Sequence, residues 1–236
     1  MKIENRKLKK KFTGGFTLPE VMIVIGFFVI MSATLSIGVS KFSNSINLTN
    51  LAYDMALSLR QTQVYGTSVK DRTSSGVSTF ESGYGLIYFS SDKLSYAMFA
   101  DDPDVSKRYN RRCGATSESV ASVSVCETSS SKEFVKKFLI GRGNSISKFC
   151  ATRPSGQKDC SDGSTASVLS YLAVSFMRPS PDAFIRTNLT PTSGDIPLLP
   201  SFYQSACIEM SSSDGTRKNS VTVSFTGFIS VANACP

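Results

Sequence analysis

The first strong pattern along the chain is an uncharged, mainly apolar run from Val21 to Ser40. At about 1.5 Å per helical residue, a run of this length can cross a hydrocarbon core of roughly 30 Å. Only a helix or a closed barrel satisfies its backbone polar groups in lipid, so the run predicts a membrane helix. Basic residues gather before it, and Lys41 is the only charge just beyond it. This bias predicts a cytoplasmic N-terminus and an extracytoplasmic remainder.

Helical periodicity continues after the apolar run. Leu48, Ala52, Met55 and Leu59 recur at steps of four and three residues, which places them on one face of a helix. We therefore expect a single helix over residues 16–66, ending where Gly-Thr-Ser supplies a stop signal. Its apolar stripe requires a partner, and the C-terminal domain is the natural one.

Beyond Val69 the pattern changes to short β-rich runs separated by Ser, Gly, Asp and Pro clusters. Asp214-Gly215 is a strong turn signal between two of these runs. The strand candidates are 84–89, 94–99, 167–177, 207–210 and 221–231, and 133–140 fits either a short helix or a strand. The predicted fold class is α+β, with a long N-terminal helix (membrane half plus amphipathic half) packed on an antiparallel β-sheet C-terminal domain.

Composition excludes several kinds of chemistry. The chain has 236 residues, a formal net charge of +8 and no histidine. Without histidine, Ser-His-Asp and Cys-His catalytic pairs and histidine-ligated zinc sites are excluded. We expect neither enzymatic activity nor a cofactor, although a hydrolase built on Asp and Glu pairs stays open. The basicity belongs largely to residues 1–15, whose six basic residues face one acidic residue.

All six cysteines lie beyond the apolar run. An even number in a translocated domain favours disulfides, which persist in oxidising compartments. Six cysteines allow 15 pairings, and the sequence does not choose among them. Pairing of sequence neighbours is the preferred hypothesis, because each bond would pin a loop or hairpin. A four-cysteine metal cluster is the weaker alternative, since no CxxC spacing occurs. The cysteines are Cys113, Cys126, Cys150, Cys160, Cys207 and Cys235.

The residues just before the apolar run form an unusual motif. Gly14 and Gly15 precede Phe16, and Glu20 follows at the mouth of the run. A carboxylate beside hydrocarbon is costly, which makes it a functional-site hypothesis. An ordinary secretory signal would instead place a small-residue cleavage site after a shorter apolar stretch. A plain signal anchor explains neither the glycine pair nor Glu20, and by itself Glu20 would be a harmless acid at a helix N-terminus.

This motif resembles the type III signal of type IV pilins and of type II secretion pseudopilins. The resemblance implies cleavage between Gly15 and Phe16 by a prepilin peptidase, N-methylation of Phe16, and an assembly role for Glu20. The layout also resembles H-class minor pseudopilins and FimT-type minor pilins, strongly over residues 11–70 and more weakly over the later strands. The implied organisation is a leader over 1–15, a helix over 16–66 that spans the cytoplasmic membrane at about 21–40, and a β-rich domain over 67–236.

Two functional hypotheses follow. The leading one is a minor pilin or pseudopilin, a structural subunit whose partners are other pilins bound through the N-terminal helix. The alternative is a pilus-associated subunit that grips DNA for uptake through Lys107, Arg108, Arg111 and Arg112, although such a run is more often a solvated loop.

A turn rich in acidic residues is a further candidate site. Asp101, Asp102 and Asp104 could contribute to a calcium site, since Ca²⁺ takes 6–8 oxygen ligands. The ligand count falls short of that number, so solvated turn aspartates are the favoured interpretation.

Overall fold

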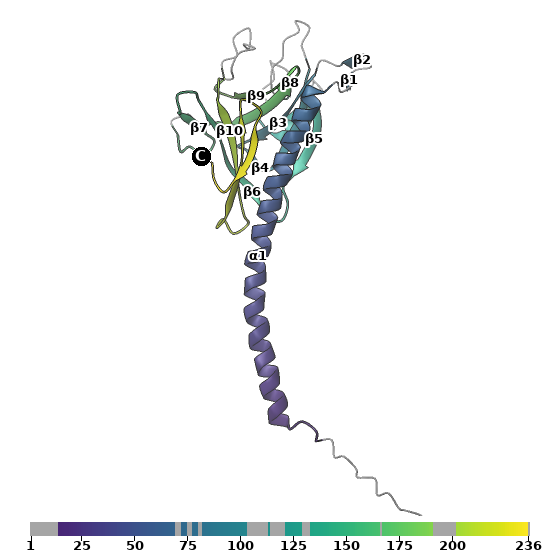
Figure 1. The fold of residues 1–236 in the computed structure, drawn as a ribbon, viewed down its shortest axis with the longest axis vertical. Coiled ribbons are helices and arrows are strands. Elements are labelled where there is room, and N and C mark those ends of the chain that lie inside the picture. Colours follow the sequence, from purple (N-terminus) through teal and green to yellow (C-terminus); the bar gives the residue numbers. More distant parts are fainter. Residues whose placement is uncertain are drawn as a thin grey trace, which may run out of the picture. The chain divides into compact units, whose positions relative to one another are not determined.

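The computed structural model describes residues 14–68, 72–74, 77–79, 82–102, 113, 121–128, 133–165, 167–190 and 202–235 (Figure 1). The chain divides into two compact units, Met1–Ser43 and Asn44–Pro236, and each is described by itself. Helix α1 (Leu18–Thr67) contributes to both units. Its start is fixed by a hydrogen bond of 3.2 Å from the Val21 N–H to the Thr17 carbonyl.

Unit Asn44–Pro236 contains two five-stranded antiparallel sheets. One sheet has the order β5-β4-β3-β8-β9 and the other the order β12-β11-β10-β6-β7. The first comprises β3 (Gly83–Phe89), β4 (Asp92–Asp101), β5 (Phe134–Leu139), β8 (Tyr171–Met177) and β9 (Ser180–Thr187). The second comprises β6 (Ser145–Thr152), β7 (Lys158–Cys160), β10 (Ser205–Ser211), β11 (Lys218–Ser224) and β12 (Ile229–Ala232).

Smaller elements complete the described chain. Strands β1 (Arg72–Ser74) and β2 (Val77–Thr79) form a separate two-stranded hairpin. A short helix, α2 (Val123–Glu127), is capped by Ser122, whose hydroxyl accepts a hydrogen bond from the Val125 N–H. Such a cap satisfies one of the backbone donors that a helix leaves unpaired in its first turn.

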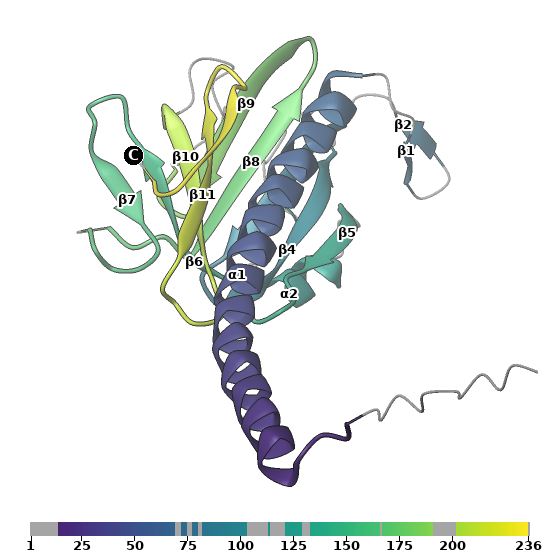
Figure 2. The ribbon, with the colours of Figure 1, turned by 60° about the horizontal axis from the view of Figure 1, so that its bottom comes forward.

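The distal half of α1 lies against the two sheets (Figure 2). Leu48, Ala52, Met55 and Leu59 are each at most 1% exposed, which confirms the predicted apolar stripe. They share one core with inward residues of the first sheet, such as Leu86 and Val174, and of the second sheet, such as Ile208 and Val221. Burial of this apolar area is the main force that holds the helix on the sheets.

The end of α1 requires glycine. A Cβ at Gly66 would collide with the backbone carbonyl of Phe176 on β8, and the Gly66 carbonyl accepts a hydrogen bond of 2.9 Å from the Arg178 N–H. Only a residue without a side chain allows the helix to approach the strand this closely. The stop signal in the sequence therefore also marks a packing contact.

Several predicted strands are confirmed. Strands β3 and β4 form the expected hairpin, and β10 and β11 pair around the turn that contains Asp214 and Gly215. Gly215 adopts a positive φ of 68°, as the turn signal requires. Residues 134–139 form a strand and not a helix.

The predicted fold class is wrong in two respects. Residues 141–165, which contain none of the predicted strands, hold β6 and β7, and these help to build a second sheet where a single sheet was expected. No helix in the described part of the chain is long and apolar enough to cross a membrane, which overturns the predicted membrane half. A span needs about 20 consecutive apolar residues.

Candidate functional site

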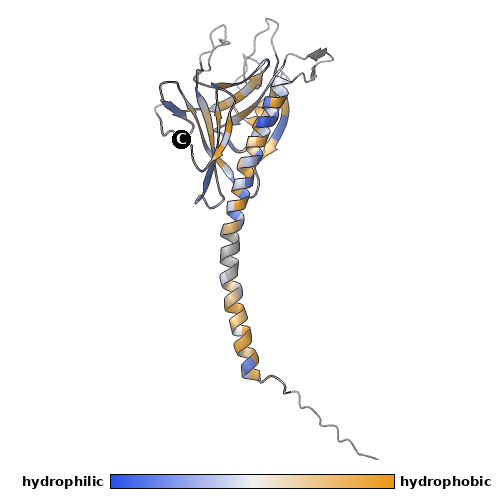
Figure 3. Ribbon diagram, viewed as in Figure 1, coloured by the Kyte–Doolittle hydropathy of each residue, from blue (hydrophilic) through white to orange (hydrophobic). Residues whose placement is uncertain are grey.

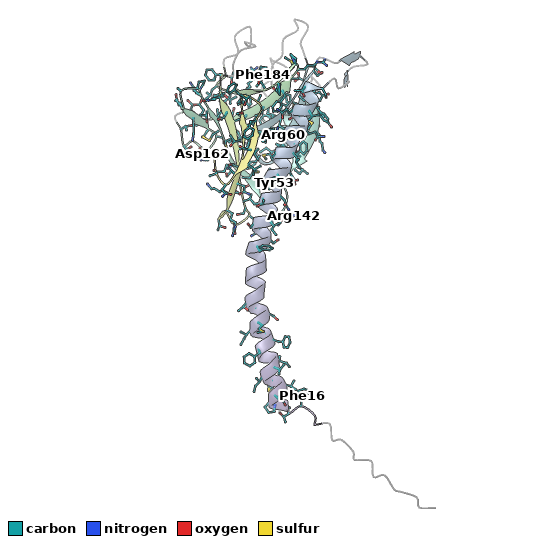
Figure 4. All side chains as sticks on the ribbon, viewed as in Figure 1. Phe16, Tyr53, Arg60, Arg142, Asp162 and Phe184 are labelled. Carbon is teal, nitrogen blue, oxygen red and sulfur yellow. A yellow bond between two sulfur atoms is a disulfide. The ribbon has the colours of Figure 1, made fainter. Side chains whose placement is uncertain are left out.

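The residues of the predicted processing site are exposed in the N-terminal segment. Gly14, Gly15 and Phe16 precede α1 and belong to no helix or strand, and Phe16 is 80% exposed (Figure 4). No described atom lies within 4 Å of where a Cβ would stand on either glycine. The peptide bond between Gly15 and Phe16 is therefore accessible, in this structure, to an enzyme that cuts there.

Glu20 lies in the first turn of α1, and its side chain is exposed. A carboxylate is favoured there because the first backbone N–H groups of a helix lack intrahelical partners and carry partial positive charge. Glu20 follows Phe16 by four positions, and Phe16 lies two residues before the first residue of α1, Leu18. This spacing would hold the carboxylate and a new terminal amine on Phe16 close to the same end of the helix.

The helix around Glu20 is apolar on every side. Figure 3 shows a largely hydrophobic ribbon with a hydrophilic band near its start. Residues Val21 to Ile25 are consecutive, so they face all directions around the helix, and each is at least 43% exposed. A helix that is hydrophobic all round is normally buried. The exposed apolar side chains are Leu18, Val21, Met22, Ile23, Val24, Ile25, Phe27, Phe28, Val29, Ile30 and Met31.

A second apolar stripe lies on the distal half of α1. Ile46, Tyr53, Leu57 and Val64 are 43–66% exposed and follow each other at steps of seven, four and seven residues. At 100° per residue this stripe faces away from the buried one, because each member is offset by two residues from a core position. We define these four residues as the outer stripe; Figure 4 labels Tyr53 within it. The sequence contained this periodicity, but the stronger buried stripe obscured it. We call that buried stripe the inner stripe; it consists of Leu48, Ala52, Met55 and Leu59.

The cysteine pairing is confirmed. Cys113 bonds Cys126, Cys150 bonds Cys160, and Cys207 bonds Cys235, with Cα–Cα distances of 5.7, 4.1 and 5.8 Å. Each bond joins sequence neighbours, as the preferred hypothesis stated. None of the six cysteines is left as a free thiol.

The acidic turn does not form a metal site in the part of the chain that is described. Asp101 is fully buried at the end of β4, and Asp102 accepts a hydrogen bond from the Ser82 hydroxyl. No group of three or more Cys, Asp or Glu side chains among the described residues is arranged to hold a metal. Asp104, and the candidate DNA contacts Lys107, Arg108, Arg111 and Arg112, lie outside the described residues.

A buried polar cluster was missed by the sequence analysis. The Asp159 Oδ2 atom accepts hydrogen bonds from the Tyr203 hydroxyl at 3.0 Å and from the Arg153 Nε at 2.9 Å. The Tyr203 oxygen also lies 3.1 Å from the Thr187 hydroxyl. The cluster joins β7 of one sheet to β9 of the other. Asp159, Thr187 and Tyr203 lie far apart in the sequence, so no local sequence pattern predicts the cluster.

Comparison of the chain with protein-family models, with curated proteins and with solved structures finds no match. The most informative observation is the combination of an apolar, exposed helix with a single carboxylate in its first turn.

Proposed function

We propose that the chain is a minor pilin or pseudopilin, a structural subunit of a type IV pilus or a type II secretion pseudopilus. The supporting observation is the exposed apolar surface of α1 from Leu18 to Met31, with Glu20 as the acidic residue within it. In an isolated chain this surface is unfavourable in water, and the N-terminal helices of other subunits would cover it. Covering this surface would supply the driving force for assembly.

In this proposal a prepilin peptidase removes the leader between Gly15 and Phe16, and the new terminal amine of Phe16 is methylated. The amine of one subunit then pairs with the Glu20 carboxylate of its neighbour. A buried charge without a partner is strongly unfavourable, whereas a paired one is tolerated. Packing registers that leave Glu20 unpaired are thereby disfavoured, so a single carboxylate selects the register of the stack.

Before assembly, the same apolar side chains need a different cover. We propose that the subunit is held at the cytoplasmic membrane, where lipid covers the apolar side chains from Phe16 to Met31 that the structure exposes. The basic residues of the leader would be attracted to the anionic lipids of that membrane. On assembly, helix contacts replace lipid contacts, and the outer stripe would extend the interface along the distal half of α1.

The test replaces Glu20 by alanine. We expect Glu20→Ala protein to accumulate and to be processed normally, but to enter sheared filaments at least ~10-fold less, since a lost buried pair costs several kcal/mol. The matched control is Glu127→Ala, which removes an exposed carboxylate on α2 and should assemble normally. Quantitative immunoblots of sheared and cell-bound fractions provide the measurement. Equal incorporation of the two variants would refute the role of Glu20.

A further inference from the structure

Three cysteines of the second sheet lie in one row across neighbouring strands. Cys160 of β7 is directly opposite Cys150 of β6, and Cys150 is directly opposite Cys207 of β10. Directly opposed residues in antiparallel strands point to the same face. The residues beside them, such as Phe149 and Ile208, belong to the core, so the cysteines occupy the outer face. Cys150 therefore has a cysteine neighbour on each side.

The spacing of the row allows Cys150 to bond either neighbour. The Cα atoms of Cys150 and Cys160 are 4.1 Å apart, as in the closer, non-hydrogen-bonded type of antiparallel pair. A strand residue directs its N–H and C=O to one side, so Cys150 and Cys207 form the hydrogen-bonded type, with Cα atoms about 5.5 Å apart. That Cα separation is inside the range of about 4.4–6.8 Å seen for disulfides. Bond formation would also require the two strands to move so that the Cβ atoms, about 5.5 Å apart in such a pair, approach to about 4.5 Å.

The two bonds of this face differ in access. Cys150, Cys160 and Cys207 are 3–5% exposed. Cys235 is only half-buried and follows the exposed residues Asn233 and Ala234 beyond the end of β12. An external thiolate would therefore reach the Cys235 sulfur before the others. Its attack would release the Cys207 thiolate directly beside Cys150.

We propose that this face is a thiol–disulfide exchange site, with an external thiol as its co-reactant. In the first step the external thiolate bonds Cys235 and breaks the Cys207–Cys235 bond, leaving Cys207 as a thiolate. Cys207 then bonds Cys150 and breaks the Cys150–Cys160 bond, and Cys160 leaves as a thiolate that takes up a proton. Each step forms one S–S bond and breaks one, so no further oxidant or reductant is consumed.

The exchange would release the C-terminal tail from β10. Asn233 of this tail lines a polar pocket of about 290 Å³ together with Ser45 and Thr49 of α1. Freeing Cys235 would remove the covalent restraint on that wall of the pocket. The concentration of external thiols would thus control whether the chain segment beside the distal half of α1 is covalently restrained. This inference does not depend on pilus assembly.

The test uses the full chain, kept soluble with detergent, and the variant Cys235→Ser. After incubation at mildly alkaline pH, free thiols are alkylated and mapped by mass spectrometry. We expect the label to shift from Cys207 to Cys160 in a share of the molecules, together with a Cys150–Cys207 cross-linked peptide. Label confined to Cys207 in folded protein would overturn the proposal.

The matched control is Cys126→Ser, which frees Cys113 on the first-sheet side of the molecule, next to α2. Cys113 belongs to a separate buried cluster, so this variant should retain both bonds of the second sheet. A second measurement needs no substitution: brief treatment of the unmodified chain with reduced glutathione should give an adduct on Cys235 and the Cys150–Cys207 bond. A first adduct on Cys160 or Cys150 would also overturn the proposal.

Discussion

At the scale of single residues, the cluster around Asp159 shows how the two sheets are joined. Asp159 and Tyr203 are both fully buried, and the carboxylate receives one charged and one neutral hydrogen bond. A buried carboxylate is tolerated only when such partners are present. The Arg153 guanidinium also lies 4.9 Å from the centre of the Phe202 ring, which places a cation over an aromatic face.

The Tyr203→Phe variant tests this cluster. Removing the hydroxyl leaves Asp159 and Thr187 without their shared partner, which should lower the free energy of unfolding by about 1–3 kcal/mol. Tyr53→Phe is the control, because Tyr53 is 57% exposed and its loss should change stability by less than about 0.5 kcal/mol. Urea unfolding with the disulfides intact supplies the measurement. Equal midpoints for the two variants would contradict a stabilising role.

Tyr203 also makes the free energy of unfolding depend on pH. Burial raises the pKa of Tyr203 from 10.0 to about 12, and the hydrogen bond to Asp159 acts in the same direction. Because the folded pKa is the higher one, the contribution is complete below pH 10 and is lost as the pH rises through 12. The stability difference between the unmodified chain and Tyr203→Phe should therefore narrow in this alkaline window.

At the scale of elements, α1 has two opposed apolar stripes with different roles. The inner stripe is covered by the sheets, whereas the outer stripe is exposed in the single subunit. A helix that served only the core of its own domain would present a polar outer face. The exposure of the outer stripe therefore supports the proposal that subunits contact each other along this face of α1.

Substitutions of two leucines, one in each stripe, distinguish the role in stability from the role in assembly. Leu59→Ala should lower the free energy of unfolding by about 2–5 kcal/mol, since it empties a fully buried position. Leu57→Gln should leave stability unchanged but reduce incorporation into filaments. Leu94→Gln on β4 is the matched control, with a similarly exposed side chain outside the helix. Thermal unfolding and sheared-filament immunoblots distinguish the outcomes; normal incorporation of Leu57→Gln would count against the outer stripe as an interface.

At the scale of the whole molecule, the two units differ in whether they bury their own apolar side chains. Unit Asn44–Pro236 buries its own core and closes it with three disulfides. The apolar side chains of the other unit, Met1–Ser43, are exposed wherever they are described. A stable domain attached to a segment that needs partners is the organisation expected of an assembly subunit. Assembly in the proposed way requires removal of the leader, because only cleavage gives Phe16 the terminal amine that pairs with Glu20.

Mass spectrometry of the N-terminus of protein isolated from cells tests that requirement. We expect the first residue to be N-methylated Phe16, because cleavage creates the amine that Glu20 needs as a partner. Protein that retains residues 1–15, or that is cut after the apolar run, would refute the proposed processing. Cells that lack the prepilin peptidase are the control and should retain the leader.

The sequence by itself determined the features that are local. The inner stripe of α1 and the hairpins of β3–β4 and β10–β11 all depend on residues close together in the chain. The second sheet was not predictable in this way. A register shift opposite Glu209 and Met210 interrupts the alternation of β6. In the first sheet, Pro181 and Asp182 similarly conceal the start of β9.

Only the tertiary structure decided which distant residues meet. Strand order placed Cys207 beside Cys150, and the packing of the sheets brought Tyr203 to Asp159. Periodicity fixes which face a side chain occupies, because it follows from backbone geometry within one element. It carries no information about which other element will cover that face, since that choice depends on the burial of the whole core.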